Sequence, residues 1–92
     1  MNEITFKVNK NGSQLWYKNG KHHRDNGPAV VYSDGSQSWY KNGEFHREDG
    51  PAIVSSNGAQ YWFKNGEYHR DNGPASIHSD GLQLWYKDGK RQ

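Results

Sequence analysis

The chain contains no cysteine, and its apolar residues never form a long run. Without cysteine there is neither a disulfide framework nor a thiolate nucleophile, as is usual in a reducing compartment. The longest apolar stretch, Ala29 to Tyr32, is far shorter than the roughly 20 residues of a membrane-spanning helix. The first residues lack the apolar segment of a signal peptide. We therefore expect a cytoplasmic protein without a transmembrane segment.

Aliphatic residues are also scarce, and neither sign of charge is in large excess. Lysine and arginine number 12 and the acids 10, a net charge of +2, and no block of like charge occurs. Only 30% of the residues are hydrophobic, but 14% are aromatic. Because each large ring buries roughly 150–250 Å², these rings can order a small chain that has few aliphatic side chains. We expect one folded domain over residues 1–92.

Glycine is abundant, and each of the eleven glycines follows an Asn or an Asp. Such pairs favour tight two-residue turns between antiparallel strands, because both residues tolerate a positive φ. The pairs recur at intervals of eight, seven and eight residues, so that Asn11, Asp34, Asn57 and Asp80 are 23 residues apart. The chain is therefore a tandem repeat. Its units cover about 6–28, 29–51, 52–74 and 75–92.

Within each unit, the segment after the proline alternates between fixed and variable positions. Alternate side chains of a strand point to opposite faces, so we expect the fixed set inside, together with the tryptophans, and the variable set outside. The fixed set comprises Ala29, Val31 and Ser33 with their equivalents, and the tryptophans are Trp16, Trp39, Trp62 and Trp85.

Hairpins are expected at about 6–18, 29–41, 52–64 and 75–87, joined by three linkers. The fold class is all-β, a single-layer antiparallel meander of about four repeated hairpins. The alternative is a short three-sided β-solenoid with one turn per unit. It would stack equivalent lysines and arginines about 4.8 Å apart, where like charges repel, so the pattern favours the meander.

One string carries a family resemblance: Trp39-Tyr40-Lys41-Asn42-Gly43-x-x-His46, within the 23-residue period. It resembles the MORN repeat, and it is more similar to a Trp-Tyr-Lys-Asn-Gly-x-x-His-Arg-x-Asp-Gly-Pro-Ala repeat of bacterial and phage proteins. The resemblance covers about residues 6–90. It implies a hairpin array that acts as a scaffolding or dimerisation module, or as a phage accessory or inhibitor protein acting on a host protein. Arginine stands where the MORN pattern has glycine, so a lipid role is not carried over.

The linkers carry the residues that most resemble a reactive site, and two interpretations stay open. His-Arg followed by an acid can be a local network in which arginine pairs with the acid and histidine binds turn carbonyls. Alternatively, Arg24, Arg47 and Arg70 form a ladder that binds nucleic-acid or lipid phosphates. A metal site is disfavoured because the repeat spacing separates the histidines. We expect no cofactor and no enzymatic activity, because no nucleophile, base or carboxylate pair breaks the repeat.

The outer face does break the repeat, since its side chains differ from unit to unit. Exposed tyrosine, leucine and phenylalanine on a rigid sheet are typical of a protein-binding surface. We therefore predict a non-enzymatic protein-binding module, with anion binding as the alternative. A homodimer through sheet edges or stacked faces stays open as a further arrangement. The predicted partner-binding residues are Leu15, Tyr32, Phe45, Tyr61 and Tyr68.

Overall fold

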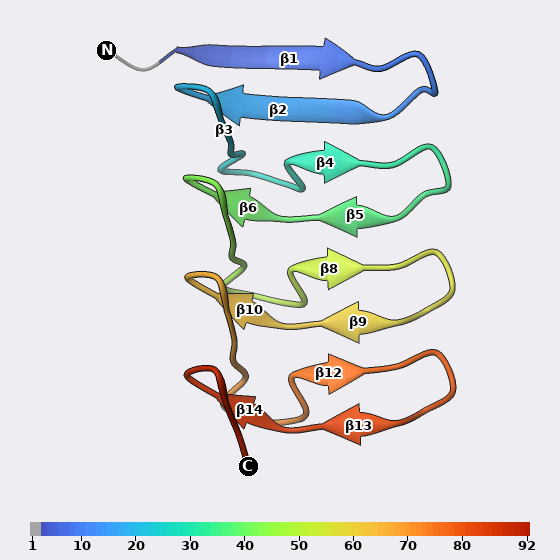
Figure 1. Ribbon diagram of the computed structural model, residues 1–92, viewed down its shortest axis with the longest axis vertical. Helices are drawn as coiled ribbons and strands as arrows, with labels where there is room; N and C mark the ends of the chain where they lie inside the picture. The colour runs from blue at the N-terminus through green and yellow to red at the C-terminus, as the bar shows by residue number, and fades with distance from the viewer. Residues whose placement is uncertain (1–2) are drawn as a thin grey trace.

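The computed structural model describes residues 3–92, which form an antiparallel meander of repeated hairpins without a helix (Figure 1). The predicted domain, 1–92, also contains residues 1–2, which lie outside the described residues. The molecule measures 39 × 30 × 17 Å, and its strands succeed one another along the longest axis. Nothing in residues 3–92 could cross a membrane as a helix. The expected single-layer meander is confirmed.

The main sheet contains nine strands. Its order is β1 (Ile4–Val8), β2 (Gln14–Lys18), β4 (Val30–Val31), β5 (Gln37–Ser38), β8 (Ile53–Val54), β9 (Gln60–Tyr61), β12 (Ser76–Ile77) and β13 (Gln83–Leu84), with β3 (Lys21–His22) paired to β2. Three two-stranded hairpins lie beside it: β6 (Tyr40–Lys41) with β7 (Glu44–Phe45), β10 (Phe63–Lys64) with β11 (Glu67–Tyr68), and β14 (Tyr86–Lys87) with β15 (Lys90–Arg91). Strands outnumber the eight expected because the second turn of each unit also closes a hairpin.

The Asn-Gly and Asp-Gly pairs play three structural roles rather than one. In the second turn of each unit both residues have positive φ, as at Asn42 (51°) and Gly43 (84°), which makes a two-residue hairpin turn. In the first turn only the glycine has positive φ, and the preceding Asn or Asp accepts the amide two residues later through its side chain, as Asp34 does from Ser36. The linker glycines, Gly27, Gly50 and Gly73, have no positive φ. The linker pairs therefore lie in turns or bends that need no positive φ, and the predicted two-residue turn geometry is wrong for them.

Backbone hydrogen bonds outside the strand ladders also join each unit to the next. The tryptophan amide donates to the alanine carbonyl of the following unit, as from Trp39 to Ala52 (2.6 Å). The glycine amide of the second turn donates to the preceding unit, as from Gly43 to His22 (2.9 Å). The chain leaves the strands at Trp39, Trp62 and Trp85, so the main sheet and the small hairpins meet at the tryptophans (Figure 1).

Burial differs from the expected inside and outside. Ala29, Ala52 and Ala75 are fully buried as predicted, but Val31 and its equivalents are only half-buried, and the predicted inner serines are exposed: Ser33, Ser56 and Ser79. The buried strand positions belong to the variable set, including Val30 and Ser38. The prediction is wrong there because larger side chains on the neighbouring strands flank the small ones, as Tyr61 and Leu84 flank Ser76.

The tryptophans do not form the predicted core. Trp16, Trp39 and Trp62 are half-buried, and Trp85 is 45% exposed. The buried apolar residues are alanines and one valine, since a single layer of strands leaves no interior large enough for indole rings. Stability must therefore come from ring stacking on both faces and from backbone pairing.

Candidate functional site

Seven rings from successive hairpins form one continuous column, which we call the aromatic column. The centroids of neighbouring rings are 4.3–5.0 Å apart, within the range of favourable aromatic pairs. All seven side chains are half-buried. In order, the column is Tyr17, His22, Tyr40, Phe45, Phe63, Tyr68 and Tyr86. Part of each side chain therefore remains accessible to solvent along the array.

Four of the five predicted partner-binding residues lie in or against this column or on its side of the sheet. Phe45 and Tyr68 belong to the column, and Tyr61 contacts Tyr68. Leu15 shares a face of β2 with Tyr17, because the two residues are two positions apart in one strand. We call this side, with its column and the row through Leu15 and Tyr61, the aromatic face.

The fifth residue, Tyr32, is 43% exposed and lies near Tyr40. The pKa of Tyr40 is raised above 10.0, first by burial and then by the neighbouring Tyr32 phenol. Burial likewise raises the pKa of Tyr68, with smaller contributions from Tyr61 and Tyr86. These phenols stay neutral at physiological pH, so the aromatic face presents uncharged hydroxyl groups.

The prediction overlooked five members of the column. Tyr17, Tyr40, Phe63 and Tyr86 follow the tryptophans directly and are not among the predicted partner-binding residues. The signal that could have found them is the two-residue turn, which places Tyr17 opposite His22 and Tyr40 opposite Phe45. His22 was seen only as a variable position, and its Nδ1 atom is buried without a hydrogen-bond partner.

On the opposite side, which we call the tryptophan face, each linker arginine lies flat on the tryptophan of its own unit. The guanidinium carbon is 3.9 Å from the Trp16 ring for Arg24 and 3.8 Å from the Trp39 ring for Arg47, and Arg70 repeats this on Trp62 at 3.9 Å. Such contacts stabilise by about 0.5–2 kcal/mol, depending on desolvation. The arginines therefore stabilise the fold and also form part of its surface.

The linker glycine covers the other face of each guanidinium. A Cβ built on Gly50 would lie 2.9 Å from Cζ of Arg47, and the corresponding distances are 3.1 Å at Gly27 and 2.8 Å at Gly73. Arg47 Nη1 also donates to the carbonyl of Pro51 at 3.0 Å. Glycine is thus required here by close packing rather than by backbone conformation.

We expect Gly50→Ala to displace the Arg47 guanidinium and to lower the free energy of unfolding by about 1 kcal/mol, the value of a partly exposed cation–π contact. Chemical denaturation measures this loss. In an Arg47→Ala background the same substitution has no guanidinium to displace, so its cost should vanish. An equal cost in both backgrounds would show that the glycine is needed for another reason.

The linker histidines connect neighbouring units. Nδ1 of His23 accepts the backbone amide of Asn42 in the next unit at 2.9 Å, so its proton lies on Nε2, which is 2.7 Å from Oδ1 of Asp25. His46 and His69 repeat this arrangement with Glu48 and Asp71. The predicted pairing is wrong in two ways: histidine, rather than arginine, takes this acid, and histidine binds an amide rather than a carbonyl.

The hydrogen bond to histidine changes the pKa of two linker acids. The hydrogen bond that Asp25 accepts from Nε2 of His23 lowers the pKa of Asp25 below 3.8, and the hydrogen bond from His46 lowers the pKa of Glu48 below 4.5. A carboxylate whose pKa is lowered in the folded state stabilises the fold at pH values above its ordinary pKa. This contribution is lost as the pH falls through the lowered pKa. Both carboxylates are largely exposed, so the contribution is small.

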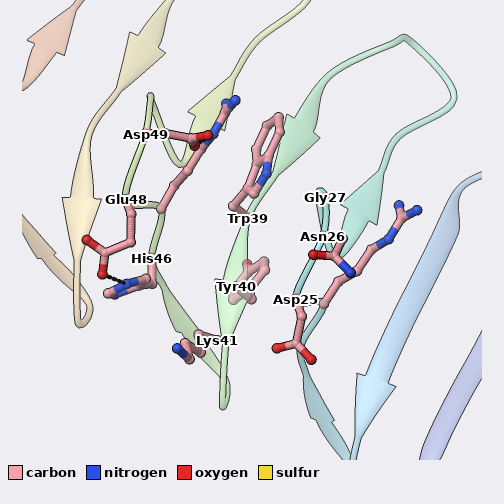
Figure 2. A pocket seen from close by; sticks show the side chains of 11 residues that line it. Asp25, Asn26, Gly27, Trp39, Tyr40, Lys41, His46, Glu48 and Asp49 are labelled. Carbon is pink, nitrogen blue, oxygen red and sulfur yellow. Dashed lines mark hydrogen bonds and ion pairs between the residues drawn. The ribbon is translucent and has the colours of Figure 1, made fainter.

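Two hollows open on the tryptophan face between successive linkers. The first, about 620 Å³, lies between the linkers of Arg24 and Arg47, with Trp39 and Lys41 between them (Figure 2). The second, about 560 Å³, repeats it around Trp62 and Lys64. Three basic and three acidic residues line the first hollow: Arg24, Lys41, Arg47, Asp25, Glu48 and Asp49. The hollow therefore carries no excess of positive charge.

Comparisons with protein-family models, curated proteins and solved structures found no match. Within residues 3–92 no group of three histidine, aspartate or glutamate side chains is placed to hold a metal ion. The two faces of the sheet are thus the candidate sites. One presents neutral rings and the other presents charged groups fixed on tryptophan.

Proposed function

We propose that the protein is a non-enzymatic protein-binding module whose partner lies on the aromatic face. The observation that carries this proposal is the aromatic column, whose seven rings stack continuously along the whole array and each keep part of their surface exposed. Soluble monomers rarely leave contiguous apolar patches of this kind uncovered. Tyrosine and phenylalanine are also enriched in the centres of protein interfaces.

The size and rigidity of the face support the same function. The sheet extends 39 Å by 30 Å, which exceeds the roughly 800 Å² per partner of a standard interface. Stacking and backbone pairing hold the rings in place, so little ordering entropy is lost on binding. An accessory or inhibitor role against a host protein is the form that the resemblance to phage repeats suggests.

Phosphate binding is the weaker alternative. The hollows beside the arginines carry equal numbers of basic and acidic side chains, whereas a surface that follows a nucleic-acid backbone needs an excess of positive charge. Each guanidinium also has one face on tryptophan and one amino group on a proline carbonyl. We therefore assign the main partner surface to the aromatic face.

The test uses residues that the chain itself carries at equivalent positions of other units, so that the variant keeps the fold. Ser55, Ser38 and His22 stand where Tyr32, Tyr61 and Tyr68 stand in other units. The variant therefore combines Tyr32→Ser, Tyr61→Ser and Tyr68→His. Gln60→Ala, on the opposite side of the main sheet, is the matched control.

Capture from host lysate with nuclease and about 300 mM salt, which suppresses phosphate contacts, should yield a specific protein with the wild type and the control. The purified partner should bind the triple variant at least about 30-fold more weakly, as expected when hot-spot rings are lost. Equal binding by the triple variant would contradict the assignment to this face. Sedimentation of the isolated protein shows whether a second copy is the partner instead.

A further inference from the structure

The three linker arginines are held alike, but one edge of the guanidinium differs between them. Each has its carbon 3.8–3.9 Å from a tryptophan ring, its other face against a glycine and Nη1 on a proline carbonyl. These contacts leave the edge that carries Nε directed away from the tryptophan and the proline. The orientation of that edge is therefore fixed before any ligand arrives.

In the second linker this edge already holds a carboxylate. Oδ1 of Asp49 accepts the Nε–H of Arg47 at 3.1 Å. The Asp49 side chain is 88% exposed. It therefore approaches the guanidinium from the solvent side and is not enclosed by other residues. Asp49 thus shows that an exposed carboxylate fits this edge.

In the first and third linkers no residue of the described part of the chain bonds to the same edge. Asn26 and Asn72 stand at the position of Asp49, and across residues 3–92 neither makes a hydrogen bond to its arginine. The nearest acid of each linker is already engaged: Asp25 lies 2.7 Å from His23 and Asp71 lies 2.9 Å from His69. Arg24 and Arg70 therefore have fixed guanidinium groups with a free Nε–H.

We propose that Arg24 and Arg70 each bind a carboxylate of an acidic protein segment through this free edge, in the place that Asp49 occupies on Arg47. A planar guanidinium suits a carboxylate, and preorganisation reduces the ordering cost of binding. We take a carboxylate rather than a phosphate as the occupant, because the Asp49 carboxylate is the group that binds the equivalent edge of Arg47. The site lies on the tryptophan face and does not rest on the aromatic face.

The spacing of the two sites defines the segment. Arg24 and Arg70 are two units apart, which is four strand spacings or about 19 Å in the meander. An extended peptide rises about 3.3 Å per residue, so two glutamates about six positions apart can reach both arginines. A single chain that binds both edges gains from the effective concentration of the second contact.

The test follows the three arginine Nε–H signals by NMR in the folded full chain during titration with a peptide of that spacing. A matched peptide with glutamine in place of both glutamates is the control. The glutamate peptide should shift the Arg24 and Arg70 signals and leave the Arg47 signal unchanged, and the glutamine peptide should shift none. Equal shifts at all three arginines, or no shift, would overturn the proposal, as would shifts caused only by a single-stranded oligonucleotide.

Two variants exchange the linkers' own residues and keep the test independent of folding. Asn26→Asp supplies the first linker with the acid of the second and should abolish the shift at Arg24, weakening the peptide at least about tenfold, as loss of a charge-assisted contact does. Asp49→Asn opens the second linker and should make the Arg47 signal respond. Unchanged responses in both variants would refute the assigned edge.

Discussion

Replacing Trp62 with alanine is expected to lower the free energy of unfolding by about 3 kcal/mol, at the low end for a large aromatic residue because the ring is half-exposed. The substitution removes the surface on which the Arg70 guanidinium lies at 3.9 Å. A loss of this size is a large fraction of the stability of a small domain. Thermal and chemical denaturation measure it.

Trp85 provides a matched control within the same chain. It occupies the equivalent position, but it is 45% exposed, and none of the described arginines lies over its ring. Trp85→Ala should therefore cost less than half as much as Trp62→Ala. If the two substitutions cost the same, the arginine stacks do not contribute to the stability of the frame.

Replacing His23 with alanine is expected to lower the free energy of unfolding by about 2 kcal/mol. His23 is 5% exposed and its Nδ1 accepts the amide of Asn42, so the substitution leaves a backbone donor of the next unit without a partner. The loss should appear as a lower denaturation midpoint and as faster amide exchange at Asn42. Exchange that stays slow at Asn42 would mean that another group replaces the imidazole.

His78 is the control for this substitution. It is half-buried on the aromatic side and its only side-chain bond among the described residues is with Oγ of Ser76, at 3.1 Å. His78→Ala removes that hydrogen bond and the edge contact of its ring with Tyr61 of the preceding unit (centroids 5.7 Å apart), but it leaves no backbone donor of another unit without a partner. Its cost should therefore stay below that of His23→Ala.

The repeat and the fold class could be predicted because they depend on local chemistry. Asn42-Gly43 and its equivalents require positive φ at two successive residues, and few other sequences satisfy that requirement. The turn then fixes which residues lie opposite one another, as Tyr40 and Phe45 do. The meander follows from these turns together with the short distance between them.

The inner face could not be predicted because it depends on which side chains lie beside one another across the strands. Variation between units was interpreted as exposure, yet Val30 is 3% exposed and Ser76 is 2% exposed. A small side chain can occupy such a position because larger ones on the neighbouring strands flank it, as Tyr61 and Leu84 flank Ser76. A pattern of alternation identifies two faces but does not say which one is covered.

The arginine site could not be predicted from the sequence for a similar reason. The sequence shows arginine beside acids in every linker, and proximity along the chain favoured the pairing of Arg24 with Asp25. In the structure the acid instead bonds to histidine, and the guanidinium stacks on tryptophan. The one remaining pair, Arg47 with Asp49, involves a residue that differs between linkers, and its significance depends on the stacking that fixes the arginine.

The hydrogen bonds between successive units have an evolutionary consequence. Backbone groups and fixed histidines form these hydrogen bonds, as from Gly43 to His22 and from Trp39 to Ala52, while the side chains of the aromatic face contribute ring stacking between units, as His22 does with Tyr40. A mutation on that face can therefore change what the protein recognises and leave the hydrogen-bonded joints in place. A duplicated 23-residue cassette would bring its own joints and extend the surface by one interchangeable module.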